Sequence, residues 1–179
     1  SKMYIIPNGF DINQFKPDAD IYANIRNQLG LGLDAKIVGL VGRFHPQKNY
    51  IYFLQNVASK IHEIRPSINF VLVGENLSAN NIELTSVISR NNLSDVTHLM
   101  GLHKNVETIM PSFDVFVSAS SSGEGFPNVI GEAMLCGIPC VVTDIGDSHL
   151  IVKDMGIVVP SNELESMVKP ILDIFDQTP

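Results

Sequence analysis

Two glutamates lie eight positions apart, Glu124 and Glu132, on either side of a glycine- and proline-containing turn that opens a predicted helix over residues 128–137. The start of a helix attracts anions, because its first backbone N–H groups are unpaired and the macrodipole is positive there. Glu132 lies within an otherwise apolar run, where an ionised carboxylate is costly unless it receives hydrogen bonds, and sugar hydroxyls are suitable donors. The pattern suggests a nucleotide-sugar pocket. The alternative is a capped surface helix with a solvated glutamate.

A second group of candidate residues lies in the loop that follows the first predicted strand. Gly42 allows a close backbone approach, and Arg43 and Lys48 bring two cations to one loop. An arginine fork together with a lysine point charge suits a diphosphate. The loop taken alone is equally compatible with two surface cations that flank the start of a helix.

Other candidates carry weaker signals. Leu102 follows the third predicted strand, where a nucleobase could lie against the backbone, although an ordinary loop is an equal alternative. The five histidines show no ligand spacing, so we interpret them as structural or exposed. Asp144 and Asp147 favour turn formation over metal binding, because no second anchoring ligand is evident. No nucleophile elbow and no P-loop motif occurs in the sequence.

The elements that would position these residues alternate between strands and helices. Short runs that are apolar on both faces are typical of a covered parallel sheet, and they occupy residues 36–41, 68–73, 96–100, 115–118, 139–143 and 156–159. Helical spacing or length favours helices over residues 21–29, 51–64, 76–92, 128–137 and 163–175. The alternation predicts an α/β fold, a Rossmann-like doubly wound parallel sheet of about six strands with helices on both faces. Ligands of such sheets bind at the carboxyl ends of the strands.

Composition narrows the class of protein. The chain has 179 residues, 45% of them apolar, and a net charge of −7 without a basic cluster, which argues against nucleic acid as a partner. No apolar run reaches the ~20 residues that span a bilayer. Cys136 and Cys140 are predicted to be buried free thiols, which fits a reducing, cytoplasmic compartment. Residues 1–20 are interpreted as an interdomain linker and residues 21–179 as one nucleotide-sugar-binding domain.

With these residues in view, the chain resembles the C-terminal, donor-binding domain of retaining glycosyltransferases of the GT-B architecture, the group 1 family. Several degenerate motifs occur in the family's order along nearly the whole chain. They are Ile6-Pro-Asn-Gly-Phe-Asp11, Val41-Gly-Arg-Phe-His-Pro-Gln-Lys-Asn49, Phe70-Val-Leu-Val-Gly74, the E-x₇-E segment from Ser120 to Glu132, and Thr143-Asp-Ile-Gly-Asp-Ser148.

The resemblance implies roles for the candidate residues. Glu124 would face the transferred sugar as the catalytic residue, and Glu132 would hold the ribose hydroxyls. Gly42, Arg43 and Lys48 would hold the diphosphate, and Leu102 would lie near the base. The remaining donor contacts would come from Gly125, Phe126, Asn128 and Val129. No metal or other cofactor is expected, because the cations and the helix start would neutralise the leaving group.

The resemblance also sets expectations about the whole protein. The family's acceptor-binding N-terminal domain and its closing helix are expected to be absent from this chain, so that the chain alone would be inactive. The complete enzyme would be cytoplasmic, with peripheral membrane association, and would transfer sugar to a glycan or lipid-linked acceptor in the synthesis of bacterial surface polysaccharide. The alternatives are a nucleotide-sugar epimerase-like domain or an NAD(P)- or FAD-binding Rossmann domain. The first strand is followed by no G-x-G-x-x-G motif, which argues against the latter.

Overall fold

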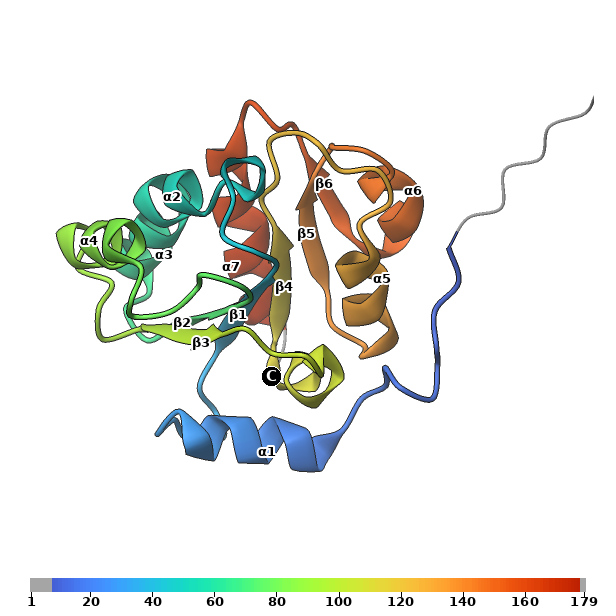
Figure 1. Ribbon diagram of the computed structural model, residues 1–179, viewed down its shortest axis with the longest axis horizontal. Coiled ribbons are helices and arrows are strands. Elements are labelled where there is room, and N and C mark those ends of the chain that lie inside the picture. Colours follow the sequence, from blue (N-terminus) through green and yellow to red (C-terminus); the bar gives the residue numbers. More distant parts are fainter. Residues whose placement is uncertain (1–7, 178–179) are drawn as a thin grey trace, which may run out of the picture.

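Six short apolar segments form one parallel sheet in the computed structural model, which describes residues 8–177. Residues 1–7, where the predicted linker begins, and residues 178–179 lie outside the described part. The strands are β1 (Ile37–Val41), β2 (Asn69–Val73), β3 (Thr97–Gly101), β4 (Val115–Ser118), β5 (Cys140–Thr143) and β6 (Ile157–Val159). Their order is β3-β2-β1-β4-β5-β6, and each pairing is parallel (Figure 1). The predicted fold class is confirmed.

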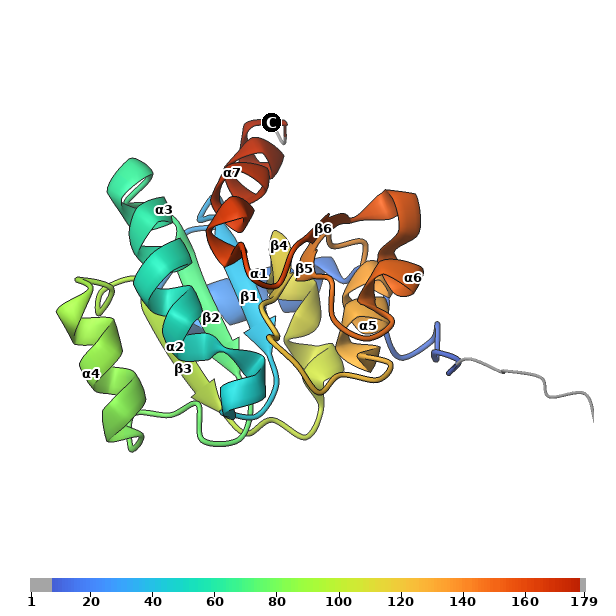
Figure 2. The same ribbon diagram turned by 90° about the horizontal axis from the view of Figure 1, so that it is seen from above.

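The central strands have apolar residues on both faces because both faces are covered. On one face of β1, Val38 and Leu40 contribute to a core that also contains residues of α2, α3, α4 and α7. On the other face, Ile37 and Val41 contribute to a core shared with α1, α5 and α6. Figures 1 and 2 show the helices distributed around the sheet in this way. Alternate residues of a strand point to opposite faces, so an unbroken apolar run fits this two-sided burial.

Seven α-helices are found in residues 8–177, most of them close to the predicted positions. They are α1 (Ala19–Gln28), α2 (Tyr50–Phe53), α3 (Ser59–Ile64), α4 (Ile82–Arg90), α5 (Asn128–Leu135), α6 (Ser148–Val152) and α7 (Val168–Gln177). A π-helical turn, η2 (Leu54–Ala58), joins α2 and α3, so the helix predicted over residues 51–64 is continuous. The short helix α6 was not predicted. Pro127, which suits a first helical turn, lies one position before α5 begins.

Helix α1 is fixed to the sheet by a buried arginine. The guanidinium of Arg26 is fully buried, and it donates to Ser112 O at 2.6 Å and to Asp114 Oδ2 at 2.7 Å. It also lies 3.4 Å from the centre of the Tyr22 ring. Asp114 Oδ2 accepts from the backbone N–H of Ile37 as well, at 2.7 Å. The arginine therefore joins α1 to the amino ends of β1 and β4, below the sheet in Figure 1.

Both cysteines are buried free thiols, as predicted. Burial raises the pKa of Cys136 to about 11 and that of Cys140 to about 12. Within the described part of the chain, none of the helices has the length and apolar character needed to cross a membrane.

Candidate functional site

The two groups of candidate residues follow neighbouring strands at the centre of the sheet. The loop with Gly42, Arg43 and Lys48 leaves the carboxyl end of β1, and the loop with Glu124 leaves the carboxyl end of β4. Strand order reverses between β1 and β4, since β2 and β3 lie to one side and β5 and β6 to the other. Open α/β sheets bind ligands at this switch point. The fold therefore brings both loops to the edge where a ligand is expected.

The loop after β1 is held in place by a buried tyrosine. The hydroxyl of Tyr50 donates to Gly42 O at 2.9 Å. Burial, and after it the charge of Glu124, raises the pKa of Tyr50, so the phenol stays neutral and remains a donor. Gly42 has a φ of +154°, in a region that side chains rarely adopt. A 3-10 turn, η1 (Pro46–Lys48), then places Lys48 at the end of the loop.

The loops after β1 and β4 are joined to each other. Lys48 Nζ lies 2.5 Å from Glu124 Oε1, and the two side chains are only 22% and 13% exposed. The same carboxylate oxygen accepts from Ser120 Oγ at 2.8 Å. The backbone N–H of Ser121 donates to Gln47 O, also at 2.8 Å. A cation and a carboxylate are thus held together beside the start of α5.

Helix α5 begins at Asn128, four residues after Glu124, and no side chain caps its start. The first N–H groups of an α-helix have no partner within the helix, although that of Ile130 donates to Pro127 O here. Glu132 lies one turn further along the helix and is half-buried. Burial, and after it the charge of Glu107, raises the pKa of Glu132. A half-buried carboxylate with a neighbouring acid is suited to accept hydrogen bonds from ligand hydroxyls.

The turn after β5 supports the Glu124 loop from the other side. The N–H of Asp147 donates to Gly125 O at 2.8 Å. Gly146 has a left-handed φ of +58°, and a Cβ atom at this position would lie 2.4 Å from the carbonyl oxygens of both Glu124 and Gly125. Only glycine fits here without displacing the loop.

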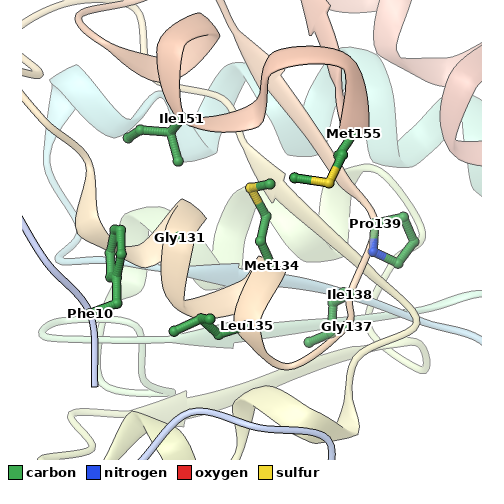
Figure 3. Close-up of a pocket in the computed structure, with 9 residues that line it drawn as sticks. All are labelled: Phe10, Gly131, Met134, Leu135, Gly137, Ile138, Pro139, Ile151 and Met155. Atoms are coloured by element: carbon green, nitrogen blue, oxygen red, sulfur yellow. The ribbon is translucent and has the colours of Figure 1, made fainter. Parts of the chain in front are cut away.

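The remaining candidates lie on the same edge of the sheet but are less enclosed. Arg43 is exposed and makes no hydrogen bond or ion pair within residues 8–177. Leu102 is 68% exposed in the loop after β3. Gly125, Phe126, Asn128 and Val129 form the turn and the first helical residues. An apolar cavity of about 510 Å³ lies on the outer side of α5, and its walls contain none of the predicted donor-binding residues (Figure 3).

Three supporting residues at this site, Ser120, Tyr50 and Gln47, were not predicted individually. Each supports a candidate residue or its loop through a hydrogen bond. The sequence offered only the position of Ser120 within the E-x₇-E segment as a signal. Within the described residues, no group of three or more His, Cys, Asp or Glu side chains is arranged to hold a metal ion.

The strand order and the loops at the switch point define a Rossmann-like α/β domain with a candidate ligand site at its carboxyl edge. Residues 35–177 match the family model for glycosyl transferases group 1. The chain belongs to this family.

Named relatives and solved structures agree with this assignment. The chain is 30% identical over 178 residues to the Escherichia coli UDP-Gal:alpha-D-GlcNAc-diphosphoundecaprenol alpha-1,3-galactosyltransferase. The alignment covers 98% of this chain and 46% of the E. coli protein. Anabaena Alr3699/HepE in complex with UDP is 27% identical with a TM-score of 0.83, over 96% of this chain and 47% of that chain. HepE has also been solved with UDP-glucose.

A third match concerns a single domain. The C-terminal domain of LpcC from Francisella tularensis has a TM-score of 0.79 over 95% of this chain and 89% of that one, at 20% identity, which shows a shared fold. This chain spans about half the length of the E. coli and Anabaena proteins. It corresponds to the C-terminal half of a GT-B fold.

Proposed function

We propose that the chain is the donor-binding domain of a retaining glycosyltransferase, which transfers a sugar from a nucleotide diphosphate sugar to a glycan or lipid-linked acceptor. The observation that carries the proposal is the Lys48–Glu124 pair, because it joins the two loops at the switch point beside the start of α5. The complexes of HepE with UDP and UDP-glucose support a nucleotide-sugar donor. The name of the E. coli relative supports a lipid-linked acceptor.

The pairing of Lys48 with Glu124 suggests how the donor binds. Lys48 is paired with Glu124, and a diphosphate would offer the ammonium a second anionic partner. Arg43, which is exposed on the same loop, supplies a second cation, and the first N–H groups of α5 supply further donors. When Lys48 turns to the diphosphate, Glu124 is released to accept hydrogen bonds from the transferred sugar. Glu132 accepts from the ribose hydroxyls.

The reaction breaks the bond between the anomeric carbon and the diphosphate oxygen, and the electron pair leaves with the diphosphate. The acceptor hydroxyl oxygen forms the new bond on the same face, and its proton passes to the departing phosphate. Lys48, Arg43 and the helix start stabilise the charge that develops on the leaving group, so no metal ion is needed. A second domain of the whole protein binds the acceptor, and the reaction takes place at the cytoplasmic side of the membrane.

Ligand titration by calorimetry tests the proposal. The chain is titrated with UDP-, GDP- and ADP-sugars, and in parallel with NAD(P) and FAD. We expect saturable binding of a nucleotide sugar that is lost in Lys48→Ala and Glu132→Ala. It should be retained in Lys60→Ala, whose partner Glu165 lies on the surface. NAD binding that is insensitive to Lys48→Ala and Glu132→Ala would instead support an oxidoreductase domain.

A further inference from the structure

A short segment near the beginning of the described chain packs against the outer face of α5. The side-chain nitrogen of Asn8 donates to Asn128 Oδ1 at 3.0 Å, across 120 positions of sequence. The ring of Phe10 lies 6.0 Å from the ring of Phe126, centre to centre. Asn128 and Phe126 both belong to the proposed donor site. The segment therefore contacts two residues of that site, one in the loop after β4 and one at the start of α5.

Phe10 fits into a depression that a glycine creates. A Cβ atom at Gly131 would lie 2.1 Å from Cζ of Phe10, so only the absence of a side chain at this position lets the ring approach the helix. Gly131 is buried and lies in the interior of α5, where glycine costs about 1 kcal/mol relative to alanine. Figure 3 shows the Phe10 ring beside this part of α5, at one end of the apolar cavity. The ring contact offsets the helical cost of the glycine.

The hydrogen bond from Asn8 has a separate effect on the first residue of α5. It occupies the amide oxygen of Asn128, so the side-chain end that Asn128 can offer a ligand is its N–H₂ group. An N–H₂ group suits phosphate and sugar oxygens, which accept hydrogen bonds. Asn8 thus sets the orientation of a side chain that belongs to the proposed donor site.

We infer that Phe10 and Asn8 are positioning residues for the donor site, acting through Gly131, Phe126 and Asn128 to fix the start of α5. The inference rests on the proposed function for its consequence in binding, but the contact itself can be tested without a ligand. Phe10 does not touch the ligand. It holds the helix start whose N–H groups do.

The first test measures amide hydrogen exchange of residues 130–133 in the ligand-free chain. Phe10→Ala should accelerate exchange by about fivefold or more, because local opening of the helix becomes easier. Phe10→Leu should give an intermediate value. The matched control is Ile12→Ala, which removes another apolar side chain of the same segment that is 68% exposed, and it should leave these rates unchanged. Equal exchange in Phe10→Ala and Ile12→Ala would overturn the inference.

The second test combines Gly131→Ala, which fills the depression, with Phe10→Ala, which removes the ring. Gly131→Ala should accelerate exchange while Phe10 is present, because the new methyl group collides with the ring. In the Phe10→Ala background the same substitution should slow exchange, because alanine favours the helix. A change of sign is expected only if the two residues contact each other. The same sign in both backgrounds would contradict the contact.

The third test links the contact to the donor. Phe10→Ala should weaken the binding of UDP-glucose by about fivefold, measured well below the melting temperature of the variant, and Ile12→Ala should not weaken it. If Phe10→Ala changes the amide exchange of α5 but leaves the affinity for UDP-glucose unchanged, Phe10 only stabilises the helix, and its role in positioning the donor site is overturned. A wild-type chain that binds none of the nucleotide sugars would refute the proposed function, while the exchange experiments would still decide whether Phe10 fixes α5.

Discussion

The ammonium of Lys48 lies 2.5 Å from Oε1 of Glu124, although the two residues are 76 positions apart in the sequence. The pair crosses from the loop after β1 to the loop after β4. It gives the proposed donor site its only lysine–glutamate contact within residues 8–177. In the proposed function, an incoming diphosphate would compete with Glu124 for this ammonium.

Replacement of Lys48 by alanine should weaken donor binding. A hydrogen bond to a charged group contributes about 1.5–3 kcal/mol, which corresponds to roughly a 10- to 150-fold increase in Kd. Lys48→Arg should recover part of the affinity because it retains the charge. Calorimetric titration with UDP-glucose checks both variants, and an unchanged Kd in Lys48→Ala would exclude a diphosphate contact.

Glu132 should bind the donor at a cost in stability. Burial and Glu107 raise its pKa in the folded chain above that of the unfolded chain. Its contribution to stability is therefore fully present below the unfolded pKa and is lost as the pH rises through the folded pKa. We expect Glu132→Gln to increase the free energy of unfolding at neutral pH while weakening donor binding.

The pH dependence of binding gives a second measure of the same residue. Hydroxyl groups donate to the ionised carboxylate, so donor affinity of the wild-type chain should fall as the pH is lowered through the raised pKa of Glu132. Urea unfolding and titration at several pH values, with Glu132→Gln alongside, check both trends. A variant that binds donor as well as the wild type would contradict the ribose contact.

The strands and the central loops could be predicted because their signals are local. Most of the six strands are runs of β-branched and other apolar residues, and the bounds of all six lie within one residue of the predicted ones. The short helix α6 escaped prediction because five residues carry too little periodicity. Ser120, Tyr50 and Phe10 were missed for a different reason. Their contacts with Glu124, Gly42 and Gly131 depend on how the chain folds, and no local sequence pattern indicates them.

Gly146→Ala should disturb the Glu124 loop, because Gly146 packs directly against its backbone. Alanine in a left-handed conformation costs roughly 1–2 kcal/mol, and here its Cβ would also collide with two backbone carbonyls. We expect about 2 kcal/mol or more of lost stability and weaker donor binding. Gly32→Ala is the matched control, because nothing lies within 4 Å of its Cβ position. If urea unfolding gives the two variants the same free energy of unfolding, the loop can move to accommodate the methyl group and the prediction is wrong.

Arg26→Ala should destabilise the domain strongly. The substitution leaves Asp114 without its buried partner, and such losses cost about 3–5 kcal/mol. Arg65→Ala removes a surface arginine whose partner, Asp176, is 59% exposed, and it should change the free energy of unfolding by less than about 1 kcal/mol. Chemical denaturation of both variants checks the contrast.

The two thiols should resist modification in the folded chain. Their pKa values, raised to about 11 and about 12, keep Cys136 and Cys140 protonated at pH 8, and the thiolate is the reactive form. Ellman's reagent should therefore react slowly with the native chain and label both cysteines in guanidinium chloride. Rapid labelling of native chain would show that one of them is accessible.

The pairing of β1 with β4 brings together two parts of the sheet that could assemble separately during folding. Only two residue pairs set its register, Val38 with Val115 and Gly39 with Phe116, whereas β1 and β2 are aligned over five pairs. A chain in which β1, β2 and β3 have assembled already carries Lys48 but still lacks the acid opposite it. Recognition of the donor thus emerges only when the later half of the polypeptide docks onto the earlier one. Binding of a donor can therefore report that this long-range docking has taken place.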